Sequence, residues 1–502
     1  MKWPNDHRPG PSPLARPLKQ PARLPRSRRI GPILGWTRKQ IADALYYCRP
    51  INRARIRAER IIRRTVIDPA SIQIPLAIGE PDVSVIIPTY GKVRYTLQCL
   101  KSIAAAPPRV SLEVIVVDDA SGEYDIGLLQ RVEGITLWRN AENLGFLRSC
   151  NLAAKKARGT FLYFLNNDAE LMPGAIDALV DLARAHPEAG AVGSKLVYPN
   201  GLLQEAGGIV WSDGSTANYG WHDDSRKPQY NYVREVDYVS GASLLVRKTI
   251  WDRLDGFDEA FAPAYYEDTD FAFRVRRAGL KVFYQPDSVV VHHEGISHRR
   301  EKNAGIQAAL GENRDRFVAR WGAELRSEQL DPGSRGMRAR DRAGQKKIAL
   351  VIAPSDEAVE PVLGTFLRQG WILKLCPLRS GRPASVEALQ QRGIEVLFNR
   401  FFVPPLRRPG RETADFDAVI LVGQKVAARY LRNVRQRTRA KLCYYSDETS
   451  VPAAHDRTKA GLQVVGAKCK AERAELTIRS EVDFVLRSPQ DIDDCLRVLG
   501  NA

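Results

Sequence analysis

The 502-residue sequence has few cysteines and no long apolar segment. Its seven cysteines are odd in number and scattered, and no Cys-x-x-Cys pair occurs, so we expect neither a disulfide framework nor a zinc cluster. This cysteine usage fits a protein of the reducing cytosol. No apolar run approaches the roughly 20 residues of a membrane-spanning helix, which argues against integral membrane insertion. Residues 1–10 lack the apolar core of a secretory signal, so we expect no export.

The charge is large and unevenly distributed. Hydrophobic residues make up 44% and charged residues 27%, an ordinary composition that predicts two or three globular domains at this length. Of the formal net charge of +18, residues 1–66 contribute +14, with 17 Lys and Arg against three acidic residues. Such a segment favours an anionic partner.

The basic segment divides into two parts. Residues 1–35 are rich in Pro and Arg and predict a disordered arm. Residues 36–80 predict a basic amphipathic helical segment, within which residues 36–66 could lie on an anionic membrane or pack an apolar stripe on the neighbouring domain. Nucleic-acid binding is not expected, because no recognition element accompanies the arginines.

The rest of the chain alternates strand-like and helix-like segments. This alternation predicts a parallel α/β sheet over residues 81–325, a linker at 326–346 and a second α/β unit at 347–502. In such sheets ligands bind beyond the carboxyl ends of the strands. The strands expected in the first unit lie at 83–87, 113–117, 135–138 and 161–165, and those in the second at 348–352, 372–375, 395–397, 418–422, 441–445 and 483–486.

Several polar residues directly follow these strands or open a helix. Turn preferences and helix capping would account for each of them separately, without any function. Successive strand residues face opposite sides, so only one of two adjacent histidines can point into a given site. The groups are Pro88-Thr89-Tyr90, Asp118-Asp119, Asn166-Asn167-Asp168, Glu267-Asp268-Thr269-Asp270 and His292-His293.

Taken together, the order and spacing of these groups resemble the family 2 glycosyltransferases over about residues 82–322. The nearest pattern is that of bacterial rhamnosyl- and galactofuranosyltransferase-like members. The motifs that carry the resemblance are VSVIIPTY (83–90), VVDDAS (116–121), NLGF (143–146), FLNNDAEL (164–171), SGASLLV (240–246), GFD (256–258), YEDTDF (266–271) and HHEG (292–295).

The resemblance implies an α/β GT-A fold with a Rossmann-like mixed sheet, and inverting transfer of a sugar from a nucleotide donor. A divalent cation, Mn²⁺ or Mg²⁺, would stabilise the diphosphate leaving group, with Asp168 and His292 as its protein ligands and His293 as a structural residue. Asn166 stands where the family has the first acid of an Asp-x-Asp motif. One fewer charge then faces the metal, and the ion is expected to arrive mainly with the donor.

The resemblance also distributes the remaining roles. Asp268 would be the general base that deprotonates the acceptor hydroxyl, with Glu267 and Asp270 orienting the acceptor or supporting the base. The residues implied in donor binding are Pro88, Thr89, Tyr90, Asp118, Asn143, Gly145, Asn166 and Asn167.

We therefore expect an enzyme that extends a bacterial surface polysaccharide, such as O-antigen or capsule, on a lipid-linked oligosaccharide. It would lie peripherally on the inner face of the cytoplasmic membrane. The alternatives are an inactive glycan-binding or scaffold subunit and, with little weight, a sugar-phosphate nucleotidyltransferase, since only Gly91 follows the first strand where such enzymes need a glycine-rich loop. Residues 347–502 more weakly resemble the amino-terminal half of a GT-B glycosyltransferase, which implies an accessory Rossmann-like domain.

Overall fold

The computed structural model describes a defined part of the chain. The described residues are 66–75, 77–293, 304–334, 336–342, 346–355, 359–378, 383–397, 416–423, 426–427, 430, 440–445 and 484–486. The predicted arm at residues 1–35 and nearly all of the predicted amphipathic helix at 36–66 lie outside them. None of the helices in the described part combines the length and apolar character that crossing a bilayer requires.

The chain divides into two compact units, each built from separate stretches of sequence. Unit 1 holds residues up to 224 together with 237–282 and 287–325. Unit 2 holds residues 225–236, 283–286 and everything from 326 onward. Two short segments from the middle of the sequence therefore fold with the carboxyl-terminal residues.

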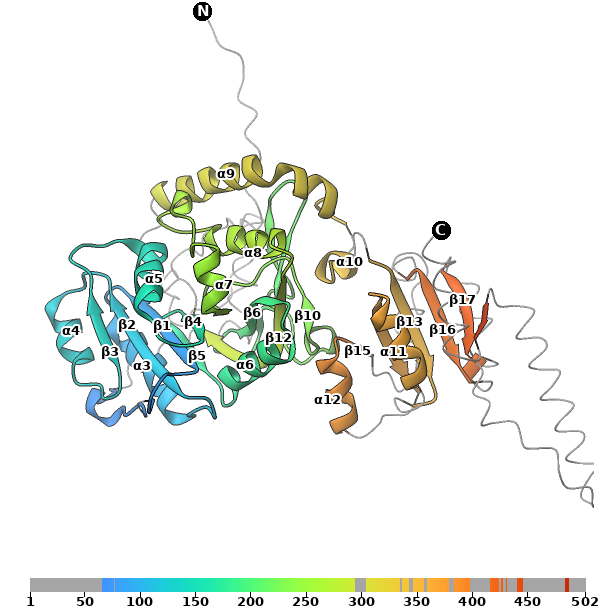
Figure 1. The fold of residues 1–502 in the computed structure, drawn as a ribbon, viewed down its shortest axis with the longest axis horizontal. Helices are drawn as coiled ribbons and strands as arrows, with labels where there is room; N and C mark the ends of the chain where they lie inside the picture. The colour runs from blue at the N-terminus through green and yellow to red at the C-terminus, as the bar shows by residue number, and fades with distance from the viewer. Residues whose placement is uncertain are drawn as a thin grey trace, which may run out of the picture. The chain divides into compact units, whose positions relative to one another are not determined.

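A mixed sheet forms the centre of the first half of the chain (Figure 1). Its strand order is β10-β12-β6-β11-β4-β1-β2-β3, with β5 on β12 and β7 on β6. The strands are β1 (Val83–Thr89), β2 (Leu112–Asp118), β3 (Thr136–Arg139), β4 (Phe161–Leu165), β5 (Ala169–Leu171), β6 (Ala189–Val197), β7 (Leu203–Glu205), β10 (Arg234–Glu235), β11 (Ser243–Arg247) and β12 (Lys281–His292). A separate hairpin pairs β8 (Gly208–Val210) with β9 (Thr216–Asn218).

Only part of this sheet is parallel. Strands β4, β1, β2 and β3 pair in parallel, and β1 and β4 are buried along their whole length, which explains their continuous apolar sequences. Antiparallel pairings join β11 to both β4 and β6, β7 to β6, and β5 and β10 to β12. Strand alternation alone predicted the parallel part, and the Rossmann-like mixed sheet implied by the family resemblance is confirmed by the antiparallel strands, which short returns such as the turn from Tyr198 to Leu202 connect.

The helices of unit 1 flank the sheet (Figure 1). Helix α9 runs alongside α8, and their side chains contact each other. The helices are α3 (Val93–Ala105), α4 (Glu123–Leu129), α5 (Gly145–Lys156), α6 (Ala175–Ala185), α7 (Lys248–Arg253), α8 (Glu267–Arg277) and α9 (Ala304–Glu328), of which residues 326–328 fall in unit 2.

Unit 2 contains a six-stranded parallel sheet in the order β15-β14-β13-β16-β17-β18. Alternate residues of β13 enter two different apolar clusters, Ala349 and Val351 in one and Leu350 and Ile352 in the other, so both faces of the sheet are covered. The strands are β13 (Ile348–Ala353), β14 (Ile372–Pro377), β15 (Glu395–Val396), β16 (Ala418–Val422), β17 (Lys441–Tyr445) and β18 (Phe484–Leu486), and the helices α10 (Gly336–Arg340), α11 (Glu360–Arg368) and α12 (Pro383–Gln391). The prediction of a second α/β unit is confirmed.

Candidate active site

The carboxyl ends of the parallel strands meet at one edge of the unit 1 sheet. Thr89 at the end of β1 lies in register with Asp118 at the end of β2, and the next residue, Asp119, donates its N–H to the Thr89 carbonyl at 2.8 Å. After β4, the Asn166 N–H donates to the Ala242 carbonyl at 3.0 Å. The turn before β11 is thereby joined to the end of β4.

The pair predicted to bind metal comes together at this edge. Antiparallel pairing of β12 with β5 sets His292 opposite Ala169, and His292 Nε2 lies 3.2 Å from Asp168 Oδ1. The Asn166 side-chain nitrogen is also 3.2 Å from the same ring nitrogen. Both Asp168 and His292 are buried. Residues 124 positions apart in the sequence therefore present one carboxylate and one imidazole to the same point.

The second nitrogen of His292 is fixed from behind. Its Nδ1 lies 3.1 Å from Gln204 Oε1, and because an amide oxygen only accepts, Nδ1 carries the proton and donates. In the neutral ring the lone pair is then on Nε2, which faces Asp168, and this is the usual arrangement behind a metal-bound histidine. Burial opposes ionisation of Asp168, but when His292 and His293 are protonated, their charges and a hydrogen bond from His292 outweigh burial and hold the pKa of this carboxyl below its ordinary value.

These donors fit a divalent cation. Among the described residues no group of three or more His, Cys, Asp or Glu side chains converges as a metal site, so the protein itself would supply two ligands, one oxygen and one nitrogen. Two protein ligands leave most coordination positions for water or phosphate oxygens, as Mg²⁺ commonly requires. The arrangement thus suits an ion that is shared with a phosphorylated ligand.

His293 points into a different environment from His292. Its Nε2 lies 2.7 Å from Glu170 Oε1, and the other oxygen of Glu170 accepts from the Gln98 amide at 2.8 Å. The ring also packs edge-on against Tyr95, with 5.7 Å between ring centroids. Neighbouring histidines at the end of β12 thus serve separate contacts, as expected from strand alternation.

The acidic pair at the start of α8, in which Glu267 is buried and Asp268 is half-buried, lies beside the turn that precedes β11. Asp268 Oδ2 accepts the Gly241 N–H at 3.0 Å, and Oδ1 accepts from the Thr269 N–H and hydroxyl at 2.7 and 3.1 Å. In the described structure Glu267 Oε2 has no hydrogen-bond partner. Burial, and then the charge of Asp268, raises the pKa of Glu267 to about 8.

Burial also raises the pKa of Asp268, although the hydrogen bonds from Gly241 and Thr269 oppose this. Three donors stabilise the Asp268 carboxylate, while Glu267 Oε2 has no donor in the described structure. We therefore assign the negative charge of the pair to Asp268 and the shared proton to Glu267. An ionised carboxylate with a raised pKa is a competent proton acceptor.

The loop at residues 143–146 is held by Asp119. The Asp119 carboxylate accepts the N–H groups of Leu144 and Gly145 at 2.8 and 2.9 Å, and the Asn140 amide at 2.8 Å. A Cβ placed on Gly241 would lie 3.4 Å from the Phe146 ring and 3.8 Å from the Asp268 Cβ. Phe146, directly after the predicted donor-binding residues Asn143 and Gly145, therefore packs against the turn that holds Asp268.

Other residues predicted to bind the donor make contacts within the protein. The Asn167 amide donates to the hydroxyls of Thr89 and Thr96 at 3.1 and 3.2 Å, in a buried network. Asp118 is fully buried, accepts from the Ser121 N–H, and lies 3.5 Å from Arg139 Nε. Pro88 is within β1, whereas the Tyr90 side chain is half exposed at the sheet edge.

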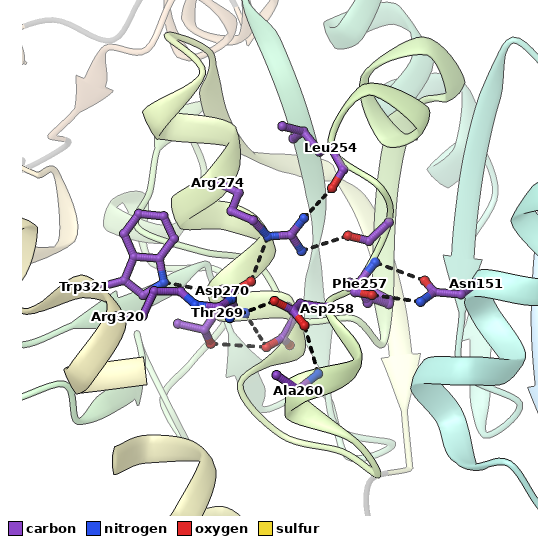
Figure 2. Close-up of polar contacts among 12 residues, drawn as sticks. Asn151, Leu254, Phe257, Asp258, Ala260, Thr269, Asp270, Arg274, Arg320 and Trp321 are labelled. Carbon is purple, nitrogen blue, oxygen red and sulfur yellow. Dashed lines mark hydrogen bonds and ion pairs between the residues drawn. The ribbon is translucent and has the colours of Figure 1, made fainter. Parts of the chain in front are cut away.

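Asp270 lies in the contact between α8 and α9 (Figure 2). Its Oδ1 accepts from Trp321 Nε1 and Arg320 Nη1, both at 2.9 Å, and its Oδ2 accepts from Arg274 Nε at 2.8 Å. Arg274 also donates to the carbonyls of Leu254 and Gly256. Asp270 therefore joins α8 to α9 through these hydrogen bonds.

Three residues that hold the predicted site residues, either directly or through the turn at Ser240, were given no role from the sequence. Asp119 was visible as half of the Asp118-Asp119 pair, although the role in donor binding went to its neighbour. Gln204 and Glu205 on β7 gave no signal, because a three-residue strand in a polar loop has no periodicity to detect. Their contacts are considered further below.

Residues 84–251 match the family model for glycosyl transferase family 2. The chain therefore contains a family 2 glycosyltransferase domain, which confirms the resemblance seen in its motifs.

Similar proteins include two with described roles. The chain is 31% identical over 255 residues to the O-antigen biosynthesis protein RfbC of Myxococcus xanthus, covering 47% of this chain and 19% of that one. It is 28% identical over 269 residues to the N-acetylglucosaminyl-diphospho-decaprenol L-rhamnosyltransferase of Mycobacterium tuberculosis, covering 48% and 87%. The chain also spans 28% of an uncharacterized protein of Sinorhizobium fredii. That protein and RfbC are therefore both much longer than the region they share with this chain.

Among solved structures, a crystal structure of GalNAc-T7 with UDP, GalNAc and Mn²⁺ is 15% identical. The alignment covers 50% of each chain with a TM-score of 0.41.

Proposed function

We propose that this protein is a metal-dependent, inverting glycosyltransferase that moves a sugar from a nucleotide-sugar donor to a lipid-linked glycan acceptor. The observation that carries the proposal is the meeting of two groups at one sheet edge. Asp168 and His292 present ligand atoms 3.2 Å apart, and the turn hydrogen-bonded to Asn166 also holds the carboxylate of Asp268. The residues proposed to stabilise the leaving group, Asp168 and His292, are therefore linked through one turn to Asp268, the residue proposed to remove the proton.

Each group has a chemical role in this reaction. Asp168 and His292 would hold a divalent cation, which when bound would supply positive charge to the departing diphosphate. Asp268 accepts the proton of the acceptor hydroxyl as that oxygen attacks the anomeric carbon from the face opposite the leaving group. Glu267 keeps its proton, which leaves one negative charge on the pair. We further propose that residues 143–145 cover the donor and that Tyr90 contacts it.

The acceptor and the setting are part of the proposal. Its support is the likeness to a rhamnosyltransferase whose name specifies a diphospho-decaprenol carrier and to an O-antigen biosynthesis protein. We extend it to a bacterial surface polysaccharide assembled at the inner face of the cytoplasmic membrane. Residues 347–502 would act as an accessory domain, for which the half GT-B resemblance remains a prediction.

A panel assay tests the activity. Purified full-length protein is incubated with individual nucleotide sugars and Mn²⁺ or Mg²⁺, with and without a lipid-linked acceptor mimic, and nucleoside diphosphate release is measured. We expect release with one or a few donors, stimulation by acceptor, and loss on chelation of the metal. Donor binding without release under any condition would instead favour the glycan-binding or scaffold alternative.

The basic segment at residues 36–66 is proposed to bind an anionic membrane. At roughly 1 kcal/mol for each arginine near the surface, Arg53, Arg57, Arg60 and Arg64 would concentrate the enzyme where lipid-linked acceptors reside. Sedimentation with vesicles containing anionic lipid should show salt-sensitive binding that is lost when these four arginines are replaced by glutamine. Equal sedimentation of both proteins would support packing of the segment against the protein.

A further inference from the structure

Strand β7 is short, buried and irregular. Its residues Leu203 and Glu205 pair with the consecutive β6 residues Val197 and Leu196, so Gln204 is an extra residue on β7. Such a bulge changes the direction of a side chain and is common beside active sites. Both polar residues of the strand are nearly inaccessible, with exposed fractions of 3% for Gln204 and 2% for Glu205.

Gln204 forms a hydrogen bond with the imidazole ring of His292. Its Oε1 accepts the Nδ1 proton of His292 at 3.1 Å, which sets both the ring orientation and the tautomer. Without this acceptor, His292 could carry its proton on Nε2, where a cation would have to bind. Gln204 therefore controls the protonation of the metal-binding atom, His292 Nε2, without contacting the metal ion itself.

Glu205 acts on the other half of the site. Its Oε1 accepts the Ser240 N–H at 3.1 Å, and Ser240 Oγ accepts the Ala242 N–H at 3.2 Å, which closes the turn. The residue between them, Gly241, donates its N–H to Asp268 Oδ2 at 3.0 Å. Glu205 thus braces the turn whose backbone holds the carboxylate of Asp268.

We infer that β7 is a shared positioning element, in which Gln204 orients the metal ligand His292 and Glu205 orients the base Asp268. The inference rests on the proposed function for the roles of His292 and Asp268. Neither Gln204 nor Glu205 is assigned contact with substrate. Two adjacent residues should therefore control two separable properties, metal affinity and the rate of transfer.

The first experiment measures metal binding without turnover. Mn²⁺ titration of the full chain, followed by loss of the free-ion electron paramagnetic resonance signal, gives a Kd. Gln204→Met keeps the side-chain volume and removes the acceptor, and we expect its Kd to rise about 10- to 100-fold. Gln204→Glu retains an acceptor oxygen and should restore affinity to within threefold of wild type. Gln130→Leu, at an exposed position, is the matched control.

The second experiment tests the role of Glu205 separately from that of Gln204. Glu205→Met should lower kcat by about 10- to 100-fold through displacement of Asp268, while the Mn²⁺ Kd stays within twofold of wild type. Glu205→Gln keeps the acceptor for Ser240 and should recover most of kcat. Glu312→Ala, an exposed change on α9, is the control. If a methionine variant does not fold, Gln204→Asn or Glu205→Asp, which withdraw the acceptor by one methylene, carry the same test.

The outcomes separate this inference from the proposed function. A wild-type Mn²⁺ Kd in Gln204→Met, or a parallel loss of metal affinity and kcat in both methionine variants, overturns the inference. Absence of nucleotide release by the wild type with every donor would overturn the proposed function, while the Mn²⁺ titrations of Gln204→Met and Gln204→Glu would still decide the role of Gln204.

Discussion

Adjacent acids at the start of α8 differ in their hydrogen bonding. Asp268 accepts from Gly241 and Thr269, while Glu267 Oε2 lacks a partner in the described structure. Burial raises the pKa of Glu267 to about 8 from an ordinary value of 4.5. Between these values the folded chain holds a proton that the unfolded chain has released, so the free energy of unfolding decreases as pH rises.

Replacing this acid should flatten that dependence. We expect wild-type Tm to fall between pH 5 and 8, and Glu267→Gln to show a smaller fall, because a neutral amide has no proton to lose. Thermal unfolding followed by circular dichroism at each pH unit measures this, with the exposed Glu312→Gln as control. An identical pH dependence in wild type and Glu267→Gln would show that Glu267 is ionised in the folded protein at pH 7.

Among the elements, buried apolar strands were the most predictable from sequence. Residues 161–165, 418–422 and 441–445 form the strands β4, β16 and β17 with the predicted bounds, because a continuous run of apolar side chains specifies burial on both faces. β7, β8 and β9 were not predicted, since tertiary pairing rather than local pattern determines such three-residue strands. The meeting of Asp168 with His292 was predicted only through the family resemblance.

The contact between α8 and α9 depends on Asp270. Asp270→Ala would leave the buried ends of Arg274, Arg320 and Trp321 without their common acceptor, at a cost of about 3–5 kcal/mol in the free energy of unfolding. Urea denaturation measures this loss, and the exposed Asp315→Ala provides the control. An unchanged free energy of unfolding together with a raised acceptor KM would instead make Asp270 an acceptor-binding residue.

At the scale of the whole molecule, the units do not follow the order of the sequence. Residues 225–236 lie in unit 2, where the Tyr232 hydroxyl donates to Asp341 Oδ1 at 2.6 Å. Lys374 Nζ lies 2.6 Å from Asp341 Oδ2 and 3.1 Å from Glu395 Oε2. Burial raises the pKa of Asp341, but the charges of Lys374 and Arg340 outweigh it and hold the pKa well below its ordinary value. No local pattern predicts this assembly of distant segments.

The buried lysine is the centre of that network. Lys374→Met fills the same space without charge, and leaves Asp341 and Glu395 with fewer cationic partners. We expect the free energy of unfolding of unit 2 to fall by about 3–5 kcal/mol. Urea denaturation with hydrogen exchange monitored on β13 and β14 would resolve it, with the exposed Lys441→Met as a control. Unchanged protection in Lys374→Met would contradict an energetic role for the network.

The most direct test of the central claim compares wild type with Asp268→Asn at saturating donor, metal and acceptor. The variant keeps the side-chain shape but cannot accept the hydroxyl proton as a base. We predict that kcat for nucleoside diphosphate release falls about 100- to 10,000-fold, while the donor Kd, measured by calorimetry, stays within twofold. A loss of less than tenfold in kcat would contradict the assignment of Asp268 as the base.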